Sequence, residues 1–197
     1  MYSQNNEEQI ITEFYQNRAI GKFLDIGAFD GINLSNTYRL VELGWEGTCV
    51  EPSSVVFSSL LETHKDNPRV KLVNAAITSK SELLKFYESN GDAVGSFDEK
   101  HKEKWEAGSS IRFREVFIKT ITMEELFSVS GYDFSFLNLD VEALNLELVT
   151  QLPLNRLPNL NLVCVEHDGK INEIVSYFGK GWTVLLTNPE NIILGRV

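Results

Sequence analysis

The chain has 197 residues, of which 43% are hydrophobic, and its 28 acidic and 18 basic side chains give a formal net charge of −10 at pH 7. A chain of this length and composition is expected to form a single domain over residues 1–197 with one hydrophobic core. The excess of negative charge argues against nucleic acid and membrane surfaces as partners, because both are themselves anionic.

The N-terminal sequence and the cysteines indicate the cellular compartment of the protein. The N-terminus lacks a basic region followed by an apolar core, and no apolar run approaches the ~20 residues of a membrane span. Cys49 and Cys164 lie inside apolar runs, which favours buried, reduced thiols over a disulfide or a nucleophile. We therefore expect a cytoplasmic protein, and these features leave its oligomeric state open.

The first predicted element is an amphipathic helix over Glu7–Asn17. Ile10, Ile11, Phe14 and Tyr15 recur at helical spacing there, so one face of the helix is apolar. Such a helix either covers a bound ligand or simply covers the sheet.

A strand at Phe23–Ile26 is followed by a glycine turn that predicts a ligand site. Gly27 and Gly31 allow the backbone to approach a ligand closely, as in turns that bind adenosine-containing cofactors. Asp25 and Asp30 in the same turn would repel a pyrophosphate but attract an ammonium or a sulfonium group. The turn therefore favours S-adenosylmethionine over NAD or ATP.

The next apolar run, Thr48–Val50, ends in Glu51. A carboxylate at the tip of a second strand is placed to accept hydrogen bonds from both ribose hydroxyls. The pattern D-x-G-x-x-x-G followed by this glutamate is a moderately specific signature of a nucleoside cofactor.

Several segments, taken in order, resemble the FkbM-type family of S-adenosylmethionine-dependent methyltransferases. They are Asp25-Ile-Gly-Ala-Phe-Asp-Gly31, Leu34-Ser-Asn-Thr-Tyr38, Leu43-Gly-Trp45, Val50-Glu-Pro52, Val73-Asn-Ala-Ala-Ile77, Phe136-Leu-Asn-Leu-Asp-Val-Glu142 and Val165-Glu-His167. The chain departs from the family at Ala143, where glycine is usual.

The resemblance implies a methyltransferase that transfers a methyl group to a hydroxyl of a sugar, glycan or other small metabolite. It also implies that Ser35 or Asn36 contacts the carboxylate of the cofactor and that Asn74 contacts the adenine edge; helix capping and an Asx turn are the alternatives. The implied cofactor-binding set is Asp25, Gly27, Gly31, Ser35, Asn36, Glu51, Pro52, Asn74, Ala75 and Asp140.

The rest of the chain alternates strands with helices. In order we expect helices over 35–43 and 52–64, a strand over 70–73, paired strands over 83–87 and 116–120, a helix opened by a capping box at Thr122, a strand over 132–139, a helix over 143–151, a strand over 160–165, a helix ending at Phe178, and a closing hairpin of 182–186 and 192–197. This order predicts a Rossmann-like α/β fold with a seven-stranded, mostly parallel sheet, a C-terminal antiparallel strand and helices on both faces.

A polar insertion over 89–110 interrupts this alternation. We interpret it as a substrate-side loop in which His101 and Trp105 carry the recognition chemistry; a solvated loop without a role is the alternative.

Polar residues follow the fourth and fifth parallel strands, where an open sheet binds its ligands. We expect His167 to be the general base, with Asp140 or Glu166 orienting the acceptor or, together with His167, holding Mg²⁺ or another divalent cation. The alternative is that His167 is only a hydrogen-bonded strand terminus. Glu142 is a further candidate for the site.

Two other functions stay open at this point. One is a module that binds S-adenosylmethionine without turnover, and the other is an N-methyltransferase, although Asp140-Val-Glu-Ala replaces the N/D-P-P-Y/F/W type motif expected for nucleic-acid N-methylation. An NAD-dependent dehydrogenase is disfavoured, because the turn lacks G-x-G-x-x-G.

Overall fold

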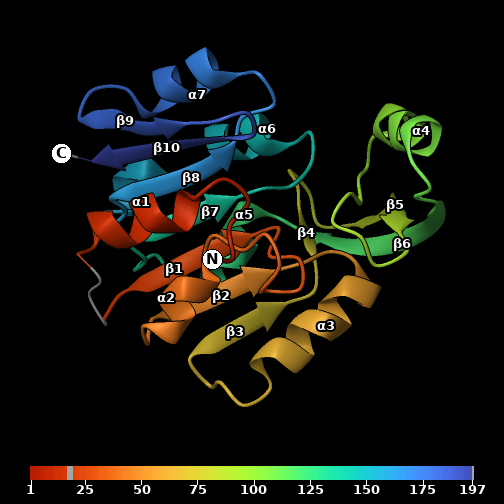
Figure 1. The fold of residues 1–197 in the computed structure, drawn as a ribbon, viewed down its shortest axis with the longest axis horizontal. Coiled ribbons are helices and arrows are strands. Elements are labelled where there is room, and N and C mark those ends of the chain that lie inside the picture. The colour runs from red at the N-terminus through yellow and green to blue at the C-terminus, as the bar shows by residue number, and fades with distance from the viewer. Residues whose placement is uncertain (17–19, 197) are drawn as a thin grey trace.

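A seven-stranded sheet lies at the centre of the computed structural model, which describes residues 1–16 and 20–196 (Figure 1). Its order is β3-β2-β1-β7-β8-β10-β9, in which β3, β2, β1, β7 and β8 run parallel and β10 is antiparallel to both of its neighbours. The strands are β1 (Lys22–Ile26), β2 (Glu46–Val50), β3 (Val70–Val73), β7 (Phe136–Leu139), β8 (Leu162–Glu166), β9 (Trp182–Thr187) and β10 (Asn191–Arg196). The predicted Rossmann-like fold class is confirmed.

Helices cover both faces of this sheet because successive strand residues point to opposite sides. In β1, Phe23 packs in one apolar cluster, with Ile11 and Leu40, and Leu24 packs in the other, with Leu126. Helices α1 (Glu7–Phe14), α2 (Tyr38–Glu42) and α3 (Ser54–His64) contribute to the first cluster, and α5 (Met123–Ser130), α6 (Asn145–Thr150) and α7 (Ile171–Phe178) to the second. A short 3-10 helix, η1, spans Leu154–Arg156.

A smaller sheet of order β4-β6-β5 stands to one side of the main sheet (Figure 1). Its strands are β4 (Ala76–Ile77), β5 (Leu83–Ser89) and β6 (Phe113–Ile121), and the predicted pairing of the two longer strands is confirmed as antiparallel. The polar insertion between them is not a plain loop, since it forms helix α4 (Glu99–Gly108). Asp98 caps this helix by accepting a hydrogen bond from the amide of Lys100.

Several predicted boundaries were wrong because side chains compete with the helical backbone. The helix expected over 35–43 begins only at Tyr38, since the Ser35 hydroxyl accepts hydrogen bonds from the amides of Thr37 and Tyr38. The helix expected from Pro52 begins at Ser54, because Ser53 caps it by accepting from the amide of Val56. Within this helix Val56 and Leu60 are buried, whereas Val55 and Leu61 are exposed.

Other elements are shorter than or shifted from the prediction. The first helix ends at Phe14, and Asn17 of the predicted range lies outside the described residues, as does Val197 of the closing strand. The strand expected over 132–139 begins at Phe136, and the one expected over 160–165 spans Leu162–Glu166.

Three local predictions are confirmed. Thr122 and Glu125 form a reciprocal capping box at the start of α5. Cys49 and Cys164 are buried free thiols. In the described ranges, every helix is too short or too polar to cross a membrane.

The turn after β7 adopts a left-handed backbone at two residues without glycine. Glu142 has φ 45° and Ala143 has φ 71°. A left-handed backbone brings the Cβ atom of a residue close to the following carbonyl oxygen, so Ala143 is strained where glycine would not be. This turn delays the start of α6 to Asn145, two residues after the predicted start.

We expect Gly27→Ala to destabilise the protein by at least about 3 kcal/mol, because the new Cβ would lie 1.7 Å from the carbonyl oxygen of Asp140. Gly131→Ala is the matched control, since φ there is also positive, at 76°, but no described atom lies within 4 Å of the added carbon. Gly131 has ψ −177°, a backbone region that only glycine adopts readily, so without a clash this variant should lose about 1–3 kcal/mol of unfolding free energy. Urea denaturation compares the two, and equal losses would contradict the crowding at Gly27.

Ala143→Gly should raise the unfolding free energy by about 1 kcal/mol, because glycine adopts φ 71° without strain. Ala107→Gly, within helix α4, should instead lower it, by up to about 1 kcal/mol. Chemical denaturation of both variants provides the measurement. A destabilised Ala143→Gly variant would show that the turn is not strained.

Candidate functional site

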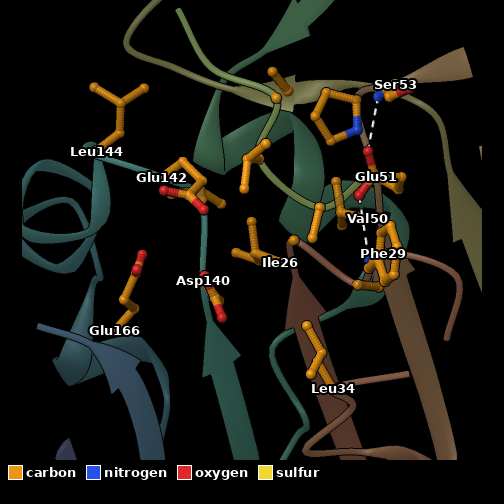
Figure 2. Close-up of a pocket in the computed structure, with 18 of the residues that line it drawn as sticks. Ile26, Phe29, Leu34, Val50, Glu51, Ser53, Asp140, Glu142, Leu144 and Glu166 are labelled. Atoms are coloured by element: carbon orange, nitrogen blue, oxygen red, sulfur yellow. Dashed lines mark hydrogen bonds between the residues drawn. The ribbon is translucent and has the colours of Figure 1, made fainter. Parts of the chain in front are cut away.

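A cavity of about 600 Å³ opens at the carboxyl ends of β1, β2, β7 and β8. This is the edge at which an open parallel sheet places its ligands. Most of the predicted site residues line it, namely Asp25, Gly27, Ser35, Asn36, Glu51, Pro52, Ala75, Asp140 and Glu166. The side chains of Glu51, Asp140, Glu142 and Glu166 project toward it from the strand ends (Figure 2).

Two residues of the glycine turn do not line the cavity. A Cβ on Gly31 would lie 2.7 Å from Leu60 Cδ1 and 2.9 Å from His64 Nε2, so this glycine lets the turn pack against α3. The Asp30 carboxylate accepts hydrogen bonds from the amides of Ile32 and Asn33 at 2.9 and 2.8 Å. The expectation that both residues face the ligand was wrong, because the chain turns away from the cavity after Phe29.

Asn74 is also outside the cavity lining. Its side chain is exposed, and its amide nitrogen donates to the carbonyl oxygens of Glu51 at 2.8 Å and Pro52 at 3.2 Å. This placement does not support the expected contact with adenine. The neighbouring Ala75, by contrast, lines the cavity.

His167 does not line the cavity either, which contradicts its expected role as general base. Its Nδ1 accepts a hydrogen bond from the amide of Gly169 at 2.9 Å, so Nε2 carries the proton and donates to the carbonyl oxygen of Asn188 at 3.1 Å. Both ring nitrogens are therefore occupied in holding a strand terminus. Among the described residues, no group of three or more histidine, cysteine or acidic side chains is arranged to hold a metal ion, so the expected divalent site finds no support.

A chain of buried polar side chains starts from Asp25. Its carboxylate accepts hydrogen bonds from Thr37 Oγ1 at 2.6 Å and Asn138 Nδ2 at 2.9 Å, while burial raises its pKa. Because Asn138 turns its nitrogen to Asp25, its oxygen accepts from Asn36 Nδ2 at 2.9 Å. The Oδ1 atom of Asn36 is left buried without a hydrogen-bond partner in the described structure. The cavity wall thus holds a free acceptor that a ligand donor can satisfy.

Glu51 lies across the cavity from these residues, at the end of β2. Its carboxyl oxygens accept hydrogen bonds from the amides of Ser53 at 2.8 Å and Phe29 at 3.2 Å (Figure 2). Burial raises the pKa of Glu51 to about 8. Each oxygen keeps a second lone pair for a ligand hydroxyl, which agrees with the position predicted for a ribose contact.

Acidic side chains gather where β7 and β8 end. Burial and the charge of the neighbouring Glu166 raise the pKa of Asp140 well above its ordinary range, and burial raises the pKa of Glu166 as well. Burial, followed by the charges of Glu166 and Asp168, raises the pKa of Glu142 to about 8. Asn145, fully buried, donates to Glu166 at 2.6 Å and to Asp168 at 3.1 Å, which fixes their positions.

Acidic side chains dominate the cavity lining, and those that are ionised give it a negative charge. Of the described lining residues, eight are acidic, one is a lysine, Lys104, and one is a histidine, His101. A cationic ligand is favoured by this charge, and a phosphate is repelled by it. The acidic members are Asp25, Glu51, Asp92, Asp140, Glu142, Glu166, Asp168 and Glu190.

The insertion supplies part of the wall that faces these acids. Helix α4 places His101, Lys104 and Trp105 on the cavity lining. Helical spacing explains this arrangement, because residues three and four apart share one helix face. That the insertion lies on the substrate side stays a prediction. The His101 Nε2 atom lies 3.7 Å from Glu142 Oε2.

The N-terminal segment contributes a carboxylate that the sequence analysis did not single out. Glu7, fully buried at the start of α1, accepts hydrogen bonds from Asn188 Nδ2 at 2.7 Å and Asn191 Nδ2 at 2.9 Å. These bonds hold α1 against the turn between β9 and β10. The helix covers the sheet, and only Gln4 ahead of it reaches the cavity.

Asn138 was also missed, although the sequence carries a signal for it. It interrupts the apolar strand Phe136–Leu139, and a buried amide there needs partners. No such local signal exists for Glu7, whose asparagine partners lie more than 180 residues away.

Comparison with known proteins gives a fold but no sequence family. No family model matches the chain, and no curated protein matches it. Solved structures do match over nearly the whole chain, at low identity.

Three of these structures are representative. A protein of Escherichia coli assigned as the methyltransferase yhhF is 10% identical, with 100% of this chain and 88% of that one covered and a TM-score of 0.54. A protein of Haemophilus influenzae assigned as a methylase is 12% identical, with 98% and 89% covered and a TM-score of 0.50. A protein of Clostridium thermocellum assigned as an rRNA methylase is 8% identical, with 100% of both chains covered and a TM-score of 0.52. The chain therefore has the Rossmann-like fold of class I methyltransferases.

Proposed function

We propose that this protein is an S-adenosylmethionine-dependent methyltransferase that methylates a hydroxyl group of a sugar, glycan or other small metabolite. The observation that carries the proposal is the anionic cavity at the carboxyl ends of the parallel strands, in a fold shared with methyltransferases. The acceptor class rests on the resemblance to the FkbM family.

The residues of the cavity fit the cofactor. Asn36 Oδ1 is a buried acceptor without a partner, and the ammonium group of S-adenosylmethionine is a matching donor. This assignment replaces the expected contact with the cofactor carboxylate, because the Asn36 nitrogen is already engaged by Asn138. Glu51 is placed for the ribose hydroxyls, and the acids after β7 and β8 favour the positive charge of the sulfonium.

When bound, the cofactor supplies a methyl group already activated by a sulfonium leaving group. The protein must align the acceptor oxygen with the methyl carbon and accept the hydroxyl proton. Asp140 and Glu166 both line the cavity, and Asn145 holds the Glu166 carboxylate in place, so the two groups are suited to hold and orient acceptor hydroxyls. Trp105 adds an aromatic surface for the apolar face of a sugar ring.

A cationic amine is a second candidate acceptor. Eight acidic residues against one lysine on the described cavity lining would attract a positively charged substrate as well as the cofactor. Mass spectrometry of the product distinguishes methyl ethers from methylamines.

Binding of S-adenosylmethionine, measured by isothermal titration calorimetry, should strengthen several-fold between pH 6 and pH 7.5. Glu51 and Glu142 have pKa values of about 8 and are largely protonated at neutral pH in the free protein. A cationic ligand favours their ionised forms, so binding releases protons, and affinity rises as the pH increases toward 8. NAD should not bind, because its pyrophosphate meets the same carboxyl groups.

Two asparagine variants, one as the test and one as its control, extend this measurement. Asn36→Ala removes the free acceptor and should weaken binding by about tenfold, as expected for one lost hydrogen bond to a charged group. Asn74→Ala lies outside the cavity and should leave the affinity within twofold. Binding of NAD but not of S-adenosylmethionine would overturn the proposal.

Methyl transfer from radiolabelled S-adenosylmethionine should be detected with members of a panel of methyl glycosides and free sugars, and not with duplex DNA or ribosomal RNA. The anionic cavity excludes polyanionic substrates. Addition of EDTA should leave the rate unchanged, because the described residues form no metal-holding group. Cofactor binding without transfer to any acceptor would instead indicate a binding module.

A further inference from the structure

Helix α4 carries an imidazole into the cavity, opposite the strained turn after β7. His101 Nε2 lies 3.7 Å from Glu142 Oε2, and the two side chains are 13% and 22% exposed. Helix α4 belongs to the insertion between β5 and β6, away from the main sheet (Figure 1). The turn that holds Glu142 follows Asp140 directly, so Glu142 lies beside the acids at the ends of β7 and β8 (Figure 2).

The surroundings of His101 indicate which ring nitrogen is free to act as a base. Nε2 is buried without a hydrogen-bond partner among residues 1–16 and 20–196, and the nearby backbone of Val94 favours the charged ring. In the tautomer that carries its proton on Nδ1, Nε2 keeps its lone pair. Burial lowers the pKa of His101, so the ring is neutral at physiological pH. A neutral imidazole with a free Nε2 is the form that accepts a proton.

Charged groups around His101 come from three parts of the fold. Lys104 on its own helix lowers the pKa of His101, whereas Asp98 before the helix and Asp168 after β8 raise it. Glu142 faces it across the cavity. Of these, Glu142 lies within ion-pair distance, so it is the group that stabilises an imidazolium at this position.

The free Nε2 suits a hydroxyl of the acceptor. At 3.7 Å, Glu142 Oε2 is too distant to form a hydrogen bond with Nε2, so the lone pair of Nε2 is open to a ligand group. The free Nε2 then gains the hydrogen bond that it lacks. A hydroxyl is the matching group, since it donates to Nε2 and keeps its oxygen lone pairs for the reaction.

We propose that His101 is the general base of the methyl transfer and that Glu142 is its positioning partner, an inference that rests on the proposed function. The acceptor oxygen forms a bond to the methyl carbon while the bond from this carbon to sulfur breaks, and sulfur keeps the electron pair. The hydroxyl proton moves to Nε2 of His101. The Glu142 carboxylate stabilises the resulting imidazolium, which then releases its proton to solvent. This assignment replaces His167, whose two ring nitrogens are occupied.

The tautomer of His101 can be tested in the ligand-free protein by nitrogen-15 NMR of its imidazole. We expect the Nδ1–H form and a titration below the ordinary range of histidine. The His101→Gln variant assigns the resonance among the three histidines. A protonated Nε2 in the neutral ring, or a His101 that is already charged at pH 7, would overturn the proposal.

His101→Gln should lower kcat by about 10²–10⁴-fold, because the amide has similar size but cannot take the proton. The KM for the acceptor and the calorimetric affinity for S-adenosylhomocysteine should change less than threefold. The assay uses the methyl glycoside that the unmodified protein methylates fastest, and the acidic limb of its pH profile should disappear in the variant. Added imidazole should partly restore the rate of His101→Ala. Glu142→Gln should lower kcat about tenfold and shift the acidic limb to lower pH, because the imidazolium loses the carboxylate that stabilises it.

Glu103→Gln is the matched control, because this exposed residue lies on the same helix and outside the cavity lining. Its kcat should equal that of the unmodified protein. An unchanged kcat in His101→Gln, with cofactor binding and transfer intact, would overturn the role of His101 and leave the proposed function standing. Failure of the unmodified protein to bind S-adenosylhomocysteine would overturn the proposed function itself. Cofactor binding without transfer to any glycoside would overturn the role of His101 as a base.

Discussion

The buried carboxylate of Asp25 sets the polar order of the whole site. An ionised carboxylate accepts hydrogen bonds and cannot donate them, so Asp25 orients the amide of Asn138 with its nitrogen toward the carboxylate. Asn138 in turn orients Asn36. This sequence of constraints leaves one acceptor, Asn36 Oδ1, free in the cavity wall. The same region admits no side chain at Gly27, because the end of β7 passes directly beside it. Strand packing and ligand recognition therefore depend on the same few atoms where β1 meets β7.

Mutual repulsion of carboxyl groups explains why the cavity suits a cation. Burial raises the pKa values of Glu51 and Glu142 to about 8, so both carboxyl groups are mostly protonated at neutral pH. Burial and the charge of Glu166 also raise the pKa of Asp140. Each of these groups becomes easier to ionise when a positive charge arrives. The free site therefore buries little net charge, which avoids the large cost of several unpaired charges in one cavity. Its carboxyl groups ionise when a cationic ligand binds, and they then attract that ligand.

The insertion between β5 and β6 completes the site from outside the Rossmann-like core. Its helix brings His101 and Trp105 to the cavity, while the core provides the carboxyl groups at the strand ends. In the proposed function, cofactor recognition and acceptor chemistry are therefore divided between these two parts of the chain. A buried hydrogen bond fixes the smaller sheet to the core, because Ser53, the cap of α3, donates to Glu88 of β5 at 2.6 Å. Arg114 of β6 donates to the same carboxylate at 2.7 Å.

The sequence by itself determined the alternation of strands and helices, the fold class and the position of Asp25, Gly27 and Glu51 at the strand ends that line the cavity, because hydrophobic period and glycine turns are local signals. It placed Asn74 and His167 directly after their strands and Gly31 in the turn after β1, but could not give their direction, since a position after a strand faces either the cavity or the neighbouring helix. Only the tertiary structure decided that His167 is tied to Asn188 and Gly169, that Asn36 presents its oxygen, and that His101 meets Glu142. These contacts join segments that are distant in the chain, and their geometry depends on how the packed sheet and the insertion meet.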